Sequence, residues 1–196
     1  MNRNQETAEM PANRPHLDRD AKAAQIVDAA ELLLLEDGFE VTTMAAIARG
    51  AGVSSNAVYW YFPSKDDVLA AVMSRRQERA MARVDAESDV SLDQRARTAL
   101  AELDEVANLT VAVHERAKHS ATVAAIHEDF HTSLDQRLCD IFAATGLGED
   151  DAEMAAAAIV AIVEGVHLHD APRDPAARDE LVLWALRRFA GDGATS

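Results

Sequence analysis

Side chains that can bind phosphates and base edges are concentrated in one short segment, VSSNAVYWYFPSKDD, which covers residues 53–67. The chain has only nine aromatic residues (five Phe, two Trp and two Tyr), and four of them are consecutive at positions 59–62. Tyrosine hydroxyls, an indole N–H and a lysine ammonium are suitable donors to phosphate oxygens. Serine and asparagine side chains can bond to base edges. An aromatic run on its own is more often part of a core, so the surrounding pattern must decide between the two interpretations.

Histidine is the second residue type that could do chemistry, and six of the seven histidines lie after residue 113. His127 and His131 are four residues apart on one predicted helix face, with Asp135 a further turn on, and this spacing can chelate a metal ion. The pair lacks a further ligand that the sequence can locate. We therefore predict no metal and no cofactor, and a metal-sensing protein that uses this pair stays the alternative. The candidate contacts for a small-molecule ligand are His114, His127, Phe130, His131 and His167.

Motifs for catalysis are missing from the sequence, so we expect no enzyme. The chain has no phosphate-binding glycine loop, no nucleophile elbow and no cysteine–histidine motif. The single cysteine, Cys139, excludes an internal disulfide and a cysteine-based zinc site, and we interpret it as a packing residue.

The net charge of −15 is unevenly distributed. Residues 1–83 carry 10 Lys and Arg against 12 Asp and Glu, whereas residues 84–196 carry 9 against 22. An acidic chain argues against nonspecific binding to nucleic acid, but the nearly neutral first part can still bind DNA if its basic residues share a face. No run of 18 uncharged apolar residues and no signal-peptide pattern occurs, so we expect a cytoplasmic protein without a membrane span.

The elements that must position these side chains are helices, because alanine is abundant and glycine and proline are sparse. We expect a polar disordered arm over residues 1–17 and a first helix from about Asp18–Asp20 to Gly38. Thr42 or Thr43 should cap a short helix over 44–50, and Ser54 or Ser55 a third one that ends near Tyr61. Ser64 and Asp67 should start a fourth helix that runs to about Glu87. Further helices are expected at 91–107, 109–119, 120–145, 151–169 and 175–190.

These elements predict an all-α fold of about nine helices. A short helix, a glycine turn at Gly52 and a second short helix form a helix-turn-helix. On the third helix Val58 and Phe62 share one face, whereas Ser55, Asn56 and Tyr59 share another that is small and polar enough to enter a major groove. The predicted domains are therefore a helix-turn-helix DNA-binding domain at 18–64 and a ligand-binding and dimerisation domain at 65–196.

Residues 22–69 resemble the DNA-binding domain of the TetR/AcrR family of bacterial transcriptional regulators. The matching positions are Ala29–Ala30, Gly38–Phe39, Thr42–Thr43, Ile47–Ala48, Ala51–Gly52–Val53–Ser54, Tyr59, Phe62 and Lys65. The resemblance covers about a quarter of the chain by motif, and the rest matches the family only in length and helical layout. Two positions depart from the family: position 56, often glycine or proline, is Asn here, and position 61, often histidine, is Tyr. These departures leave the operator sequence open.

The resemblance implies a role for each residue of the segment. Thr43 should contact a phosphate, and Met44 should face the groove. Ser55, Asn56 and Ala57 should open the recognition helix, while DNA backbone contacts should come from Tyr59, Trp60, Tyr61 and Lys65.

The resemblance also implies a homodimer formed by the helices at 151–169 and 175–190. Their sequences support this, since 150–169 is apolar on nearly all sides, and Leu181, Trp184, Ala185 and Phe189 form an apolar stripe. The alternative is that both helices only close the core of one chain. The implied function is a repressor that binds a palindromic operator on double-stranded DNA and is released by a small molecule, through movement of the fourth helix. A helical scaffold with no DNA role is the second alternative.

Overall fold

Helices make up all the regular structure in the computed structural model, which describes residues 14–87, 89–168 and 174–191, with side chains described from residue 19 and not at 167–168. The predicted all-α fold is thus confirmed for these residues. Within the same ranges, no helix combines the length and the apolar character that a membrane crossing requires. The helices are α1 Arg14–Val41, α2 Met44–Gly50, α3 Ser55–Tyr61, α4 Lys65–Ala86, α5 Leu92–Glu105, α6 Ala107–Ala117, α7 Ala121–Ala144, α8 Glu149–Leu168 and α9 Pro175–Ala190.

The start of α1 differs from the sequence prediction. The helix begins at Arg14, so residues 14–17, which we expected in a disordered arm, are helical. The predicted arm over residues 1–13 lies outside the described residues. The sequence predicts that the first helix ends at Gly38. Gly38 does interrupt the helix, with a φ of 80° in the left-handed region, but a last turn continues to Val41.

Two hydrophobic cores organise the chain. The first contains apolar side chains of α1, α2 and α3 together with Val68, Leu69 and Val72 of α4, and it also takes in residues of α6 and α7. The second joins α5, α7, α8 and α9 around Phe142 and Leu183. Because the first turns of α4 are buried in the first core, α4 is fixed rigidly to the helix-turn-helix, as the absence of a flexible linker predicts.

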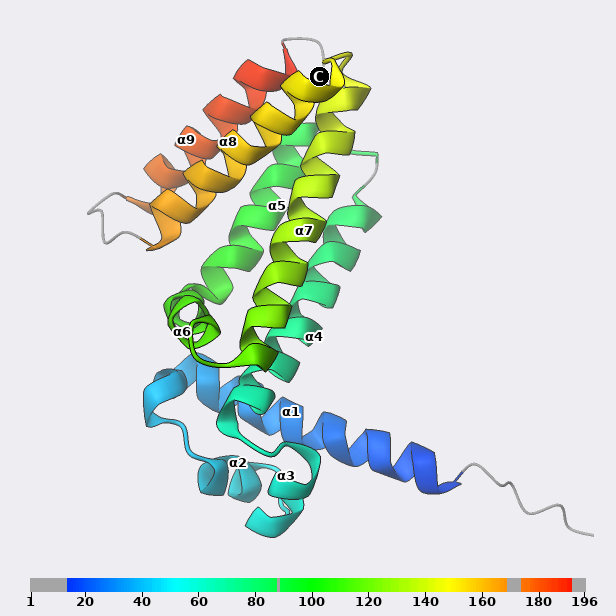
Figure 1. The fold of residues 1–196 in the computed structure, drawn as a ribbon, viewed down its shortest axis with the longest axis vertical. Helices are drawn as coiled ribbons and strands as arrows, with labels where there is room; N and C mark the ends of the chain where they lie inside the picture. Colours follow the sequence, from blue (N-terminus) through cyan, green and yellow to red (C-terminus); the bar gives the residue numbers. More distant parts are fainter. Residues whose placement is uncertain (1–13, 88, 169–173, 192–196) are drawn as a thin grey trace, which may run out of the picture.

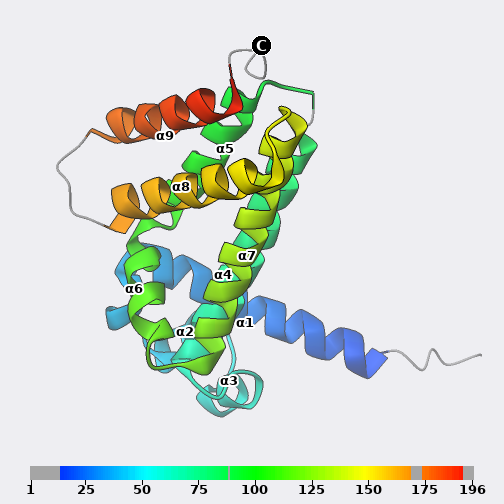
Figure 2. The ribbon, with the colours of Figure 1, turned by 45° about the horizontal axis from the view of Figure 1, so that its top comes forward.

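The arrangement of the helices places α2 and α3 at one end of the molecule (Figure 1). From there α4 rises beside α7 through the middle of the molecule, and these two helices pack against each other. At the opposite end α8 and α9 lie side by side, which Figure 2 shows from a second direction. The short α6 lies between the two ends and packs on α1, α7 and α8.

A buried carboxylate holds α4 against α1. Glu31 of α1 is only 8% exposed, and its carboxylate accepts hydrogen bonds from three arginines of α4. Arg76 Nη1 lies 3.2 Å and Arg79 Nη1 3.3 Å from it, and Arg75 also bonds to Asp28 at 2.6 Å. Arg76 additionally pairs with Glu105 of α5. A charge buried in this way is stable only with such partners.

Replacing Glu31 with glutamine will lower the free energy of unfolding by about 3 to 5 kcal/mol, because three arginines lose the buried charge that they surround. Chemical denaturation followed by circular dichroism measures this change. The matched control is Glu36→Gln, which alters an exposed residue of the same helix and should change the free energy by less than about 0.5 kcal/mol.

The same cluster predicts a pH dependence. Burial acts to raise the pKa of Glu31, but hydrogen bonds from Arg75 and Arg76 and the charges of Arg75 and Arg79 outweigh it and lower the pKa from its ordinary value of 4.5. A carboxyl with a lowered folded-state pKa contributes stability above 4.5 that is lost as the pH falls through the folded pKa. The wild type should therefore lose more unfolding free energy below pH 4.5 than Glu31→Gln does. Equal losses would contradict this role of the arginines.

Candidate functional site

The helix-turn-helix presents a polar face to solvent at the lower end of Figure 1. Thr43, Ser55 and Asn56 are exposed, and Tyr59 and Trp60 are 51% and 63% exposed. On the opposite side of α3, Val58 is fully buried. The separation that the sequence predicts between a core face and a polar face of α3 is therefore present.

Two capped helix starts and one turn hold this face in place. The Thr43 hydroxyl accepts a hydrogen bond from Ala46 N, and the Ser54 hydroxyl accepts one from Ala57 N, both at 3.2 Å. Between the helices Gly52 has a φ of 63°, which favours glycine. The Thr43 hydroxyl proton remains able to donate, so the cap is compatible with a phosphate contact.

Three of the predicted contact residues are placed differently from the others. Met44 is only 8% exposed and packs in the first core, so the prediction that it faces the groove is wrong. Its position at the start of α2 puts it on the same side as the buried Ile47 and Ala48. Ala57 and Tyr61 are half-buried. Tyr61 packs against the core, and its ring and that of Trp60 meet edge to face with their centroids 4.8 Å apart.

Lys65 is already bound within the chain. Its Nζ donates to Phe39 O at 2.7 Å and to Glu40 O at 3.4 Å, and it lies 4.1 Å from the centroid of the Phe39 ring. The ammonium thus holds the last turn of α1, just after the bend at Gly38. Carbonyl oxygens do not neutralise its charge, so Lys65 remains a source of positive potential at this end of the molecule.

A cavity of about 160 Å³ lies between α4, α5, α6, α7 and α8. Most of its lining is apolar, with Met73 and Met81 of α4, Leu103 of α5 and Phe130 of α7 among the contributors. The structure brings four of the five predicted ligand contacts to this cavity: His114, His127, Phe130 and His131. The side chain of the fifth, His167, lies outside the described ones.

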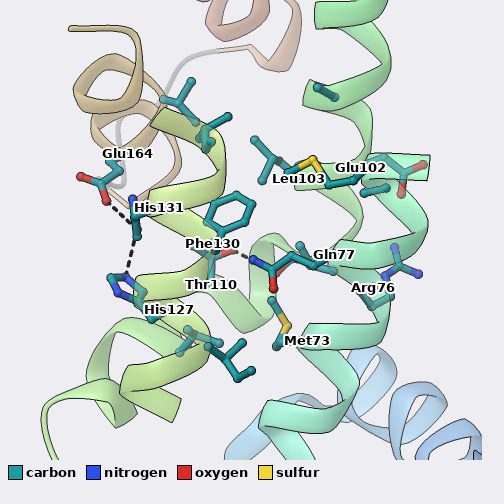
Figure 3. A pocket seen from close by; sticks show the side chains of 18 of the residues that line it. Met73, Arg76, Gln77, Glu102, Leu103, Thr110, His127, Phe130, His131 and Glu164 are labelled. Atoms are coloured by element: carbon teal, nitrogen blue, oxygen red, sulfur yellow. Dashed lines mark hydrogen bonds and ion pairs between the residues drawn. The ribbon is translucent and has the colours of Figure 1, made fainter. Parts of the chain in front are cut away.

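Three histidines and one glutamate form the polar end of the cavity. His131 Nε2 lies 3.2 Å from His127 Nε2 and 3.2 Å from Glu164 Oε1, and both contacts are drawn in Figure 3. The rings of His114 and His127 meet edge to face, with centroids 4.5 Å apart. Burial, and then the neighbouring His131 and His114, lower the pKa of His127, which favours its neutral form.

Ion pairs and hydrogen bonds connect the cavity to the helix-turn-helix. Arg76 lines the cavity and also binds Glu31 of α1. Two residues beyond His114 on α6, the Arg116 guanidinium holds Asp66 of α4 with bonds of 2.9 and 2.6 Å. The hydrogen bond from Arg116, with a smaller part from its charge, lowers the pKa of Asp66 despite burial.

The sequence interpretation recognised the spacing of His127 and His131 but missed Glu164 and the H-E-x-x-H form of the segment. Residues 127–131 are HEDFH, which matches H-E-x-x-H, a spacing that places two zinc-binding histidines on one helix face. Glu164 is an isolated acid within the apolar stretch AIVEGV. A single carboxylate within an apolar helical stretch was the signal that could have indicated that α8 contributes to the site.

Comparisons with known proteins identify the helix-turn-helix region. Residues 26–72 match the family described as "Bacterial regulatory proteins, tetR family". The HTH-type transcriptional regulator SrpR of Pseudomonas putida is 45% identical over 53 residues, which are 27% of this chain and 25% of that protein. The chain likewise aligns with only 40% of the uncharacterized regulator TtgW of Pseudomonas putida. This chain therefore spans less than half the length of these two relatives.

Longer matches extend the likeness to most of the chain. The HTH-type transcriptional regulator BetI of Burkholderia ambifaria is 29% identical over 168 residues, covering 78% of this chain and 84% of that protein. The crystal structure of a transcriptional regulator from Rhodococcus sp. Rha1 has a TM-score of 0.68 at 26% identity and covers 86% of this chain and 94% of that chain. A TetR transcription regulator from Haloarcula marismortui, with a TM-score of 0.71 at 20% identity, covers 90% of this chain and all of that chain. This last likeness shows the fold alone.

Replacing Lys65 with alanine will lower the free energy of unfolding by about 1.5 to 3 kcal/mol, the range for hydrogen bonds to a charged group, even when no DNA is present. Thermal and urea unfolding of the free protein measure this loss. Lys118→Ala, which removes an exposed lysine beyond α6, is the control and should be close to neutral. An unchanged stability of the Lys65 variant would mean that its bonds to Phe39 and Glu40 are not maintained in solution.

Proposed function

We propose, from the premise that this chain belongs to the TetR family of bacterial regulatory proteins, that it is a homodimeric repressor that binds a palindromic operator. A small molecule that enters the cavity releases it from DNA. The family is one of transcriptional regulators and not of enzymes, and a regulator of bacterial genes works in the cytoplasm, where we place this chain. The observation that carries the proposal is that α4 lines the cavity and also begins within the core of the helix-turn-helix.

DNA recognition is assigned to the exposed polar face of α2 and α3. Ser55 and Asn56, at the start of α3, read base edges in the major groove, and Ala57 lies beside them. Thr43, Tyr59 and Trp60 contact phosphates, which fixes the position of α3 without reading the sequence. Tyr61, which is half-buried, and Lys65 complete the backbone contacts. In this assignment the domain at 18–64 reads DNA and the remainder, 65–196, binds the effector.

Release from DNA follows from a population shift between two positions of α4. An effector that binds more tightly to the form that does not fit DNA favours that form, and by reciprocity DNA weakens effector binding by the same factor. The cavity is mostly apolar with a histidine-rich end, so the matching effector has an apolar body and one polar or metal-binding group. His114, His127, Phe130, His131 and His167 are the proposed contacts.

Dimerisation is assigned to α8, Glu149–Leu168, and α9, Pro175–Ala190, which correspond to the helices predicted at 151–169 and 175–190. Met154 of α8 is 72% exposed and Trp184 of α9 is 61% exposed, and Ala157 and Ala161, which follow Met154 at helical spacing on α8, are also exposed. Exposed apolar patches of this kind mark interfaces. A two-fold axis through them forms an interface of four helices and suits a palindromic DNA site. In the predicted apolar stripe of α9, Ala185 is buried in the chain's own core and Trp184 is exposed. Ala185 therefore fits a helix that closes the core of one chain, whereas Trp184 fits a dimer interface.

Selection from random-sequence DNA duplexes tests the proposal directly. The protein should enrich one site made of two half-sites related by two-fold symmetry. A helical scaffold without a DNA role would enrich nothing, and so would a regulator that needs its effector to bind DNA. Repeating the selection after dialysis against a chelator and with added zinc tests the case in which the required effector is a metal ion.

On the selected site, Tyr59→Phe should weaken binding by a factor of about 3 to 10, the equivalent of one hydrogen bond, with the same factor for every sequence. Asn56→Ala should instead change which base is preferred at one position of each half-site, by about 1 to 3 kcal/mol. Lys65→Ala should lower the salt dependence of binding by about one unit. Fluorescence anisotropy at several salt concentrations measures all three, and a Tyr59→Phe variant that altered base preference would contradict its assignment.

Changing Trp184 to aspartate should convert the dimer to a monomer, because a charge then replaces the large apolar side chain at the two-fold interface. Light scattering after size exclusion gives the mass. The control is Leu32→Asp, which places the same charge at a residue of α1 that is 70% exposed and should leave the dimer intact. A Trp184→Asp protein that stayed dimeric would place the interface elsewhere.

A further inference from the structure

The polar end of the cavity has the composition and geometry of a metal site. Its four side chains come from three helices: His114 from α6, His127 and His131 from α7, and Glu164 from α8. One ligand atom of each lies within 4.8 Å of the corresponding atoms of the others. Two of these separations are 3.2 Å and a third is 3.7 Å. Ligands about 2.0 to 2.1 Å from a tetrahedral zinc ion lie about 3.4 Å from one another, so only small side-chain movements are needed.

His114 is oriented as a metal ligand. Its Nδ1 lies 2.9 Å from Thr110 O, and because a carbonyl oxygen can only accept, Nδ1 must carry the proton. The lone pair is therefore on Nε2, which is buried without a hydrogen-bond partner. Metal-binding histidines commonly donate their other N–H to a backbone carbonyl in this manner. A cation would supply the partner that Nε2 lacks.

The contact between His127 and His131 fits the same interpretation. Their Nε2 atoms face each other at 3.2 Å, with Glu164 Oε1 on the far side of His131 (Figure 3). Three imidazole nitrogens and one carboxylate oxygen suit zinc and neighbouring divalent ions such as cobalt and nickel. Magnesium and calcium prefer sites made of oxygen ligands, so a cluster with three nitrogen ligands does not suit them.

We propose that His114, His127, His131 and Glu164 bind one divalent transition-metal ion of the zinc class, through the three Nε2 atoms and the Glu164 carboxylate. The four protein ligands complete a tetrahedral shell, which is typical of sites that keep no position for a substrate. Glu128, the acid of the HEDFH segment, is exposed on α7 and takes no part. The site therefore senses or responds to metal and does not catalyse a reaction.

Metal binding at this position joins α6, α7 and α8, and α6 is attached to the helix-turn-helix. Arg116 of α6 holds Asp66 at the start of α4, and the Asn108 side chain donates to Leu35 O of α1 at 2.8 Å. The metal is thus placed to change the position of α4, together with the helix-turn-helix fixed to it, relative to α7 and α8. The existence of the metal site rests on these four residues alone, whereas its regulatory effect rests on the proposed function.

Titration of the chelator-treated, full-length protein with Co²⁺ tests the site. We expect one ion per chain, with the visible absorption bands of tetrahedral cobalt, and displacement of cobalt by Zn²⁺. His131→Ala and Glu164→Gln should each weaken binding at least 100-fold. His119→Ala, which changes an exposed histidine just beyond α6, should bind as the wild type does. Circular dichroism shows whether each variant is folded. If His131→Ala does not fold, Glu164→Gln decides the test, because glutamine keeps the shape of the glutamate side chain.

The absence of tetrahedral cobalt bands in the wild type would overturn the site, as would equal affinity in a folded Glu164→Gln protein. Binding to the selected DNA duplex is then measured with and without Zn²⁺. We expect zinc to change DNA affinity at least fivefold in the wild type and not in Glu164→Gln. Zinc binding without such a change would refute the regulatory effect and leave the site standing. Zinc binding by a protein that selects no DNA would refute the proposed function and not the site.

Discussion

The contact between one buried carboxylate and three arginines fixes α4, the helix that lines the cavity, to α1 beside the helix-turn-helix. Glu31 of α1 is surrounded by Arg75, Arg76 and Arg79 of α4, and its charge is stable in a buried place only because they are there. The first turns of α4 are also buried in the core of the helix-turn-helix. Because α4 is a continuous helix from Lys65 to Ala86, its first turns and the part that lines the cavity cannot move independently. Every proposal about regulation depends on this constraint.

Ion pairs between α1 and the cavity can pass a change in the cavity on to the helix-turn-helix. Arg76 contacts the cavity, Glu31 and Glu105, so a ligand that displaces it affects three helices. Arg116 and Asp66 form a second connection through α6. Close packing makes such contacts change between discrete arrangements and not by gradual deformation. The histidine cluster lies where α6, α7 and α8 meet, at the cavity end of this second connection.

Local patterns predicted the helices and the exposed and buried sides of α3 because these depend on neighbours in the sequence. Ser54 and Ser64 cap α3 and α4 as their types suggest, and Val58 is buried while Tyr59 is exposed. Met44 was misplaced because family resemblance was used without its helical position beside Ile47. The histidine cluster could be predicted only in part, since His127 and His131 share a helix but His114 and Glu164 reach them through tertiary packing. The bonds of Lys65 to Phe39 and Glu40, 26 and 25 residues away, were likewise beyond the reach of local patterns.

Coupling between the cavity and the DNA-binding end can be measured without knowing the effector. Ala80 of α4 lines the cavity, whereas Ala82 of the same helix is exposed. The decisive measurement is the affinity of Ala80→Phe and Ala82→Phe for the selected DNA duplex, in proteins shown to be folded and dimeric. The account predicts that Ala80→Phe, which fills the cavity as an effector would, binds DNA at least tenfold more weakly than the wild type, while Ala82→Phe stays within about twofold, a shift of roughly 0.4 kcal/mol. Equal affinities of the two variants would contradict a connection between the cavity and the recognition helix.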